Sequence, residues 1–230
     1  MKIGVCIPTF FRSYGLHRAL RSIHDTVTFD DVPGLTVHPI VAYEQDDTEA
    51  ARLAQQFGAI PAPCAIPRNG TSYCWNTALA AASNFDAYVL GADDLYFMYG
   101  VWAEAVKQIK AGYGFVGLND NDIRELRVNQ DTCKVIRNPD YVCHYLMTRD
   151  FIVQHHGGVM AVPWYDGWWL DVESTMRAKR AKTFIHALDA NIKHDWKGSA
   201  GNGGKYEQNK AMYDMRKRAG FPDDFEPVIR

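Results

Sequence analysis

The chain has 230 residues, of which 47% are hydrophobic and 23% are charged, so it can bury a full core as one domain. This composition excludes a disordered chain and a fibrous repeat. The formal net charge of -2 creates no overall attraction to a polyanion, so any nucleic-acid contact must use a local basic surface.

The chain contains five cysteines and no CxxC pair. The odd number favours reduced thiols, as in the cytosol. The apolar run at residues 3–7 is too short for a secretion signal and ends at Pro8, and no window approaches the roughly 18 apolar residues of a membrane span. We therefore expect a cytoplasmic protein that does not insert into membranes, and its oligomeric state stays open.

The first half of the chain alternates strand-like and helix-like segments. Apolar runs at 3–7, 35–43 and 87–90 predict strands. Helical spacing of apolar residues predicts helices near residues 16–23, 49–57, 72–84 and 101–110. This alternation is typical of an α/β protein with a parallel or mostly parallel sheet.

The second half is less regular. Strand-like pieces at 113–118, 133–137 and 141–147 are interrupted by a polar stretch at 119–131. A helix is expected to begin near Arg149. The remaining segments are an aromatic cluster at 162–169, a helix up to Arg180, a strand at 184–188, a glycine-rich loop at 197–204 and an amphipathic helix at 205–219.

Polar residues follow several of the predicted strands. Loops at 8–12, 44–47 and 91–94 lie where ligands bind in open α/β sheets, beyond the carboxyl ends of the strands. Asp93 and Asp94 place two carboxylates at such a strand end, which is a usual position for a hard divalent cation. The alternative is that one carboxylate caps the next segment and the other is solvated.

Three motifs follow one another along the chain: Ile7-Pro8-Thr9-Phe10-Phe11-Arg12, then Pro67-Arg68-Asn69-Gly70 with Trp75-Asn76-Thr77-Ala78-Leu79, and then Gly91-Ala92-Asp93-Asp94. Their order resembles the inverting nucleotide-sugar glycosyltransferases of family two, which have the GT-A fold. Gly91 stands where the family's first metal-site Asp usually lies, and Asp93 stands where its metal-coordinating Asp lies. The resemblance implies an α/β GT-A fold, a Rossmann-like and mostly parallel central sheet flanked by helices, in a single domain spanning 1–230.

The same resemblance divides the domain by role. Residues 1–112 would bind the nucleotide sugar, residues 113–196 would form the acceptor side, and residues 197–230 would supply a flexible loop and a C-terminal helix. A UDP-sugar is the favoured donor. The residues implied to bind the donor are Pro8, Thr9, Phe10, Arg12, Glu44, Asp46, Arg68, Asn69, Asn76, Ala92, Asp93 and Arg177.

The resemblance also implies a cofactor and a catalytic base. Mn²⁺ or Mg²⁺ would be held by Asp93, Asp94 and His194, a late histidine that many family members place on the metal or the diphosphate. The alternative for His194 is a tether for the last helix. Asp171 is the candidate base, because Leu170-Asp171-Val172-Glu173 with Arg177 resembles the family's Glu-Asp segment and the Arg that follows it, and Asp166 is its competitor.

The acceptor is not identified by the sequence. Aromatic rings at Trp164, Tyr165, Trp168 and Trp169 would stack on a sugar or on an extruded base. The acceptor is therefore either a saccharide or lipid-linked hydroxyl, or a hydroxymethylated base in DNA, as in phage-type DNA-modifying glycosyltransferases. Basic stretches at 177–182 and 216–218 would supply phosphate contacts in the second case, although such stretches are commonly solvated helix faces. A catalytically silent nucleotide- or glycan-binding module is the alternative class, because Gly91 replaces a metal-site Asp.

Overall fold

The computed structural model describes residues 1–66, 69–120, 141–165, 169–195 and 203–229, with the backbone alone of two short strands inside 121–140. An eight-stranded sheet runs in the order β3-β2-β1-β4-β9-β6-β10-β5. Its strands are β1 Lys2–Pro8, β2 Thr36–Glu44, β3 Ile60–Cys64, β4 Ala87–Leu90, β5 Leu95–Phe97, β6 Phe115–Asp120, β9 Tyr145–Thr148 and β10 Phe184–His194. Strands β7 Arg127–Asn129 and β8 Lys134–Ile136 form a separate antiparallel pair.

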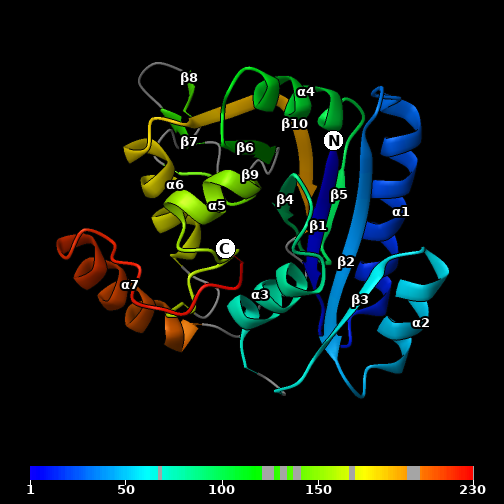
Figure 1. Cartoon of the computed structure of the whole chain (residues 1–230), viewed down its shortest axis with the longest axis horizontal. Helices are drawn as coiled ribbons and strands as arrows, with labels where there is room; N and C mark the ends of the chain where they lie inside the picture. Colours follow the sequence, from blue (N-terminus) through cyan, green and yellow to red (C-terminus); the bar gives the residue numbers. More distant parts are fainter. Residues whose placement is uncertain are drawn as a thin grey trace.

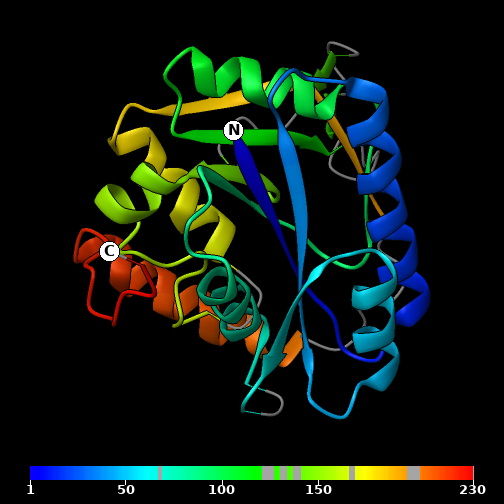
Figure 2. The same cartoon turned by 45° about the vertical axis from the view of Figure 1, so that its right-hand side comes forward.

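The sheet is mostly parallel, as expected. Strands β3, β2, β1, β4, β6 and β10 point one way, while β9 and β5 run against their neighbours. Helices cover both faces (Figures 1 and 2). The helices are α1 Ser13–Asp30, α2 Thr48–Gln56, α3 Thr71–Ala81, α4 Val101–Lys110, α5 Arg149–His155, α6 Leu170–Arg180 and α7 Gly203–Arg218.

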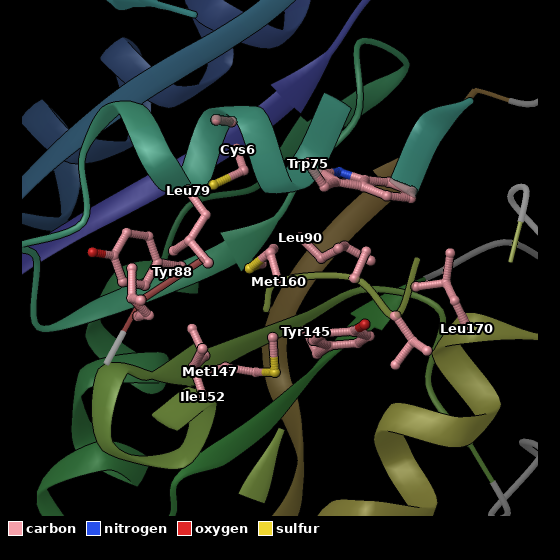
Figure 3. Packing of buried hydrophobic residues seen from close by; sticks show 14 of the residues in the cluster. Cys6, Trp75, Leu79, Tyr88, Leu90, Tyr145, Met147, Ile152, Met160 and Leu170 are labelled. Carbon is pink, nitrogen blue, oxygen red and sulfur yellow. The ribbon is translucent and has the colours of Figure 1, made fainter. Parts of the chain in front are cut away.

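Alternating side chains of the buried strands build a core on each face. In β1, Ile3, Val5 and Ile7 pack toward α1, α2 and α4, while Cys6 belongs to the core beneath α3, α5 and α6. Figure 3 shows the second core, which combines Trp75 and Leu79 of α3 with residues from the strands and with Ile152 of α5. Burying both faces of the sheet fixes the strand ends, and therefore the loops that carry the polar residues.

The structure departs from the expected strands at several places, because β3, β5 and β7 were not expected and β10 is longer than expected. Strand β3 was not placed because Ile60–Cys64 carries Pro61 and Pro63, which suit an edge strand that pairs on one side only. Strand β10 is longer than the expected 184–188, since it continues through an irregularity in its register between Ala187 and Asn191 and ends at His194. The extension matters because it carries His194 into the sheet.

The last helix and the segment after it close one side of the molecule. Helix α7 matches the expected helix at 205–219 and packs against α6, and the chain then returns so that the amides of Val228 and Ile229 donate to the Gly158 carbonyl at 2.9 and 3.0 Å. Among the described residues, none of the helices combines the length and apolar character that crossing a bilayer requires.

Candidate active site

One edge of the sheet collects the polar residues. The carboxyl ends of the parallel strands and the beginnings of the antiparallel strands β9 and β5 meet there, because an antiparallel strand starts where its parallel neighbours end. Residues far apart in the sequence are thereby brought to one edge. They are Thr9 after β1, Glu44 at the end of β2, Asp93 and Asp94 after β4, Asp120 at the end of β6, His144 before β9 and His194 at the end of β10.

Asp93 is a buried carboxylate with both oxygens engaged. The Thr9 hydroxyl donates to its Oδ2 at 2.8 Å, and Nη1 of Arg12 lies 2.9 Å from its Oδ1. Its exposed fraction is 3%. Burial raises the pKa of Asp93 to about 6, although Arg12 and Thr9 act in the opposite direction. Asp93 is therefore an anion at neutral pH that is stabilised by a neighbouring cation.

Asp94 meets His194 across the end of the sheet. The antiparallel pairing of β10 with β5 sets His194 opposite Leu95, and the Asp195 amide donates to the Asp94 carbonyl at 2.8 Å. This register brings His194 Nε2 to 3.2 Å from Asp94 Oδ1. Burial acts to raise the pKa of Asp94, but His194 and Arg12 together hold it below its usual value. Two of the three predicted metal ligands thus lie in direct contact.

The other ring nitrogen of His194 faces two residues that the sequence did not single out. Its Nδ1 is 3.4 Å from Nε2 of His144 and 3.8 Å from Oδ2 of Asp120. One donor atom from each of the three side chains fits within 4.8 Å, a grouping able to hold a metal ion. His144 is buried, and burial together with the neighbouring His194 lowers its pKa to about 3. A signal for Asp120 existed, since it follows an apolar strand as Asp93 does, whereas His144 gave none.

The donor chemistry fits a divalent cation. Carboxylate oxygens suit Mg²⁺ and Mn²⁺, and an imidazole nitrogen beside them favours Mn²⁺ over Mg²⁺. The guanidinium of Arg12 contacts both Asp93 and Asp94, and its Nη2 lies 3.2 Å from Asp94 Oδ2. The two carboxylates therefore already attract a positively charged group. The Arg12 side chain is 38% exposed, so it has room to swing away when a cation enters.

The loop after β1 is fastened by an aspartate that the sequence analysis left unassigned. Asp47 caps α2 by accepting from the Ala50 amide at 3.0 Å, and it also accepts from the Phe11 amide at 2.8 Å. Phe11 has a positive φ of 50°, and the Phe10 and Phe11 rings are about half exposed. Asp47 therefore holds the loop so that it presents its rings to solvent beside the acidic edge.

Other predicted donor residues line the same edge. Pro8 ends β1, and Glu44 ends β2 with an exposed fraction of 6%. Asp46 is exposed in the following turn, Asn69 is exposed just before α3, and Ala92 is partly buried beside Asp93. Arg68 lies outside the described residues, as do Asp166 and Trp168.

Gly91 has a steric reason for lacking a side chain. A Cβ added there would lie 2.9 Å from the Cys6 carbonyl oxygen and 3.0 Å from a Val5 methyl group. The Trp75 indole N–H donates to the Gly91 carbonyl at 2.8 Å, which fixes the peptide from the other face. The backbone before Asp93 is therefore too close to β1 to carry the carboxylate that the resemblance expects at this position.

Three of the residues predicted to contact ligands form hydrogen bonds within the protein. Asn76 uses its amide to hold the backbone of Met160 and Ala161, at 2.7 to 3.0 Å. Tyr165 is buried, and its hydroxyl donates to Glu173 at 2.6 Å. Arg177 donates to Glu173, Asp223 and the His155 and Pro222 carbonyls, and its Nη2 lies 2.9 Å from Glu173 Oε1. These side chains therefore stabilise the fold in the described structure.

Glu173 is the centre of a buried ionic network. It has an exposed fraction of 0% and accepts from Arg177 at 2.9 Å and from Arg216 at 2.9 and 3.1 Å. Arg216 also donates to Asp224 at 2.6 Å. Arg177 and Arg216 are the first residues of the two basic stretches considered for DNA phosphates, and both are unavailable because they are buried in these ion pairs.

The candidate base and the aromatic residues lie around the start of α6. Asp171 is in the first turn and is partly exposed. Trp164 is 45% exposed and donates from its indole to Asp224 at 3.1 Å. Trp169 has a positive φ of 71° and is partly buried against Tyr206 and Tyr213 of α7. Trp164 thus presents an apolar ring to solvent, whereas Trp169 is packed.

This arrangement, a mostly parallel sheet with acidic residues at the carboxyl end of β4, is the GT-A fold. Glucosyl-3-phosphoglycerate synthase from Mycobacterium tuberculosis, in complex with phosphoglyceric acid, is similar with a TM-score of 0.65 and 16% identity, over 97% of this chain and 81% of that chain. S. aureus TarS, residues 1–349, is similar with a TM-score of 0.66 and 12% identity, over 84% of this chain and 60% of that chain.

One of these neighbours is also similar in a complex that contains nucleotide and metal. The same mycobacterial synthase is similar in a complex with Mn²⁺, UDP and glucosyl-3-phosphoglycerate, with a TM-score of 0.61, 16% identity and the same coverage. No protein-family model matches this chain, and the comparison with curated proteins finds no match. At these identities the structural similarity shows the fold alone.

Proposed function

We propose that the chain is a metal-dependent inverting glycosyltransferase that moves a sugar from a nucleoside-diphosphate sugar to an acceptor hydroxyl. The observation that carries this proposal is the contact of His194 with Asp94, beside the buried Asp93, at the carboxyl edge of a GT-A sheet. The UDP and Mn²⁺ bound by the mycobacterial synthase support the same class of donor and cofactor. A UDP-sugar is accordingly the favoured donor.

The donor would lie along the edge from β2 to β10. Phe10 and Glu44 would contact the base and ribose, a proposal supported by the neighbouring positions of the loop after β1 and the end of β2. Asp93, Asp94 and His194 would hold the cation. When bound, Mn²⁺ or Mg²⁺ supplies the positive charge that stabilises the departing diphosphate. Arg12, released from the two carboxylates, would then turn to a phosphate oxygen.

The acceptor hydroxyl requires a base on the opposite face of the sugar. Asp171 is our candidate, since an aspartate is ionised at neutral pH and this one is partly exposed at the start of α6. Deprotonation of the hydroxyl as it attacks the anomeric carbon gives a single displacement with inversion. Asp166 remains the competing base in this proposal.

The acceptor would approach over the segment around Trp164. Its exposed ring suits the apolar face of a sugar, which favours a saccharide or lipid-linked acceptor. The alternative acceptor, hydroxymethylated DNA, is less favoured because Arg177 and Arg216 are committed to Glu173. The steric exclusion of a carboxylate at Gly91 is the observation that keeps a silent binding module as the second candidate.

The test is a screen of nucleotide sugars for Mn²⁺-dependent release of the nucleoside diphosphate, with and without saccharides and hydroxymethylated DNA. We expect release with one donor and stimulation by a saccharide. Asp94→Asn should lose at least about tenfold in rate, since it removes a charge from the metal site, while Asp25→Asn, on the exposed face of α1, should match wild type. If the protein binds nucleotide tightly but releases no nucleoside diphosphate with any metal, the binding-module proposal replaces the glycosyltransferase proposal.

The base is tested separately. Asp171→Asn should abolish transfer while leaving Mn²⁺ and UDP binding intact, because the base does not contact the donor diphosphate. Product stereochemistry, read by NMR at the new anomeric centre, should be inverted. Normal turnover in the Asp171→Asn variant would move the assignment to Asp166.

A further inference from the structure

His144 is a buried imidazole in contact with a proposed metal ligand. It precedes β9 and has an exposed fraction of 6%. Its Nε2 lies 3.4 Å from Nδ1 of His194, and the two rings meet at 87° with centroids 4.8 Å apart. Two lone pairs at this separation would repel, so one of the two nitrogens must carry a proton that the other accepts.

The surroundings of His144 indicate that it is the acceptor. Nδ1 of His144 is buried and has no hydrogen-bond partner among the described residues, and the Leu90 carbonyl acts to raise the pKa of the ring. A carbonyl oxygen favours a proton on the ring nitrogen that is not otherwise engaged, and Nε2 is already directed to His194. A buried imidazole is neutral and carries one proton, so Nδ1 is protonated and Nε2 keeps its lone pair.

We propose that His144 is a positioning residue that accepts the Nδ1–H of His194 and thereby turns the His194 Nε2 lone pair toward Asp94 and the divalent cation. Metal-binding histidines characteristically donate their second N–H to a carboxylate, a carbonyl or water, which fixes both tautomer and ring orientation, and here the neutral imidazole of His144 would be that acceptor. The inference rests on the proposed function, because it assigns the cation to the side of His194 that faces Asp94.

The geometry separates this role from direct coordination by His144. The two nitrogens of one imidazole point in diverging directions, so a single ion bound at Nε2 of His194 lies away from the Nδ1 side. Nε2 is the nitrogen that meets the acidic pair, at 3.2 Å from Asp94. Asp120 is the rival partner for Nδ1, but it is more distant at 3.8 Å, beyond a hydrogen bond.

The test measures Mn²⁺ alone, by the EPR signal of the free ion during titration. His144→Phe removes the acceptor at similar size and should weaken Mn²⁺ binding about 10- to 100-fold. His144→Gln places an amide oxygen near the position of Nε2 and should recover most of the affinity. His155→Phe, at an exposed histidine, is the control and should bind as wild type does.

Pulsed EPR provides a readout that a purely structural role would not change. Wild type should show one directly coordinated imidazole nitrogen, and His144→Phe should lose that coupling or show it weakened. If His144→Phe does not fold, His144→Asn carries the comparison, because its amide is too short to reach Nδ1 of His194 while His144→Gln still reaches it. Circular dichroism and urea unfolding identify the folded variants.

Three results would overturn the proposal. Equal Mn²⁺ affinity in wild type and in the folded His144→Phe or His144→Asn variant removes the positioning role while leaving the proposed function intact. Loss of affinity in Asp120→Asn but not in His144→Phe makes Asp120 the partner. Two coordinated imidazole nitrogens in wild type make His144 itself a ligand. A wild-type protein that binds no Mn²⁺ and releases no UDP would instead remove both the inference and the proposed function.

Discussion

Arg12 forms an ion pair with Asp93 in which Nη1 and Oδ1 are 2.9 Å apart. The Arg12 guanidinium therefore pairs with the same carboxylate that the proposed cation would bind. The two cations compete in the free protein, and they cooperate only if Arg12 moves to the diphosphate after the donor binds.

Replacing Arg12 tests this competition. Arg12→Gln should raise the affinity for Mn²⁺ alone about two- to fivefold, which corresponds to the small free energy of a partly exposed ion pair. The same change should weaken UDP binding in the presence of Mn²⁺. Isothermal titration calorimetry at low salt measures both, with Arg52→Gln, an exposed residue of α2, as the control. Weaker binding of Mn²⁺ alone would show that Arg12 supports the cation rather than competing with it.

Introducing the expected carboxylate at Gly91 should destabilise the protein without improving metal binding. In Gly91→Asp the new Cβ meets the Cys6 carbonyl and Val5, so the free energy of unfolding should fall by about 1–3 kcal/mol with no gain in Mn²⁺ affinity. Gly91→Ala introduces the same Cβ without charge and should lose a similar amount. Urea unfolding and metal titration give the two measurements. A stable Gly91→Asp protein with tighter Mn²⁺ binding would contradict the steric account.

Glu173 should be the most sensitive acidic residue for stability. Glu173→Gln leaves Arg177 and Arg216 buried with too little negative charge, so we expect a loss of about 3–5 kcal/mol in the free energy of unfolding. Glu49→Gln removes one partner of an exposed pair with Arg52 and should change little. Urea unfolding at pH 7 makes the comparison. Similar stability of the two variants would mean that the network contributes no more than a surface pair.

His156 should make the protein less stable in acid. Burial lowers its pKa to about 4, and its Nδ1–H donates to the Val159 carbonyl while Nε2 faces the Ser174 hydroxyl, both at 2.8 Å. Between pH 6.5 and 4 the His156 imidazole is protonated in the unfolded chain and neutral in the folded chain. The contribution of His156 is therefore complete above pH 6.5 and declines by about 1.4 kcal/mol per pH unit as the pH falls through this window.

A variant isolates that contribution. Asp93 has the opposite effect, because its raised pKa makes the folded chain bind a proton more readily than the unfolded chain. Comparing wild type with His156→Gln cancels this and every other shared titration. Unfolding free energies measured from pH 7 to 4.5 should fall less steeply in the variant, and parallel curves would show that His156 carries no such linkage.

Local pattern was sufficient to predict the alternating architecture and the acidic strand end. Apolar runs bounded by polar loops located β1, β2 and β4, and Asp93 follows from the last of these. The contact of His194 with Asp94 depends instead on the register of β10 with β5, which joins residues about 100 positions apart in sequence. No periodic signal encodes that pairing, and none marked His144, so its contact with His194 became visible only in three dimensions.

Charge patterns were misleading for a related reason. Arg177 and Arg216 resemble solvated or phosphate-binding cations in the sequence, because a basic stretch does not reveal which of its members turns inward. Their burial depends on Glu173 lying within reach of both α6 and α7. Asn76 and Tyr165 likewise have the chemistry of ligand contacts but are committed to the backbone of residues 160–161 and to Glu173.

The short strand β5 has consequences for the order in which the protein is completed during synthesis. Its partner is β10, so residues 95–97 leave the ribosome long before the strand that pairs with them. The contact between Asp94 and His194 closes only when β10 lies between β6 and β5, and such distant pairings form late because a long loop must be ordered first. A nascent chain would therefore complete the acidic edge that holds Asp94 and His194 only after the rest of the sheet has assembled.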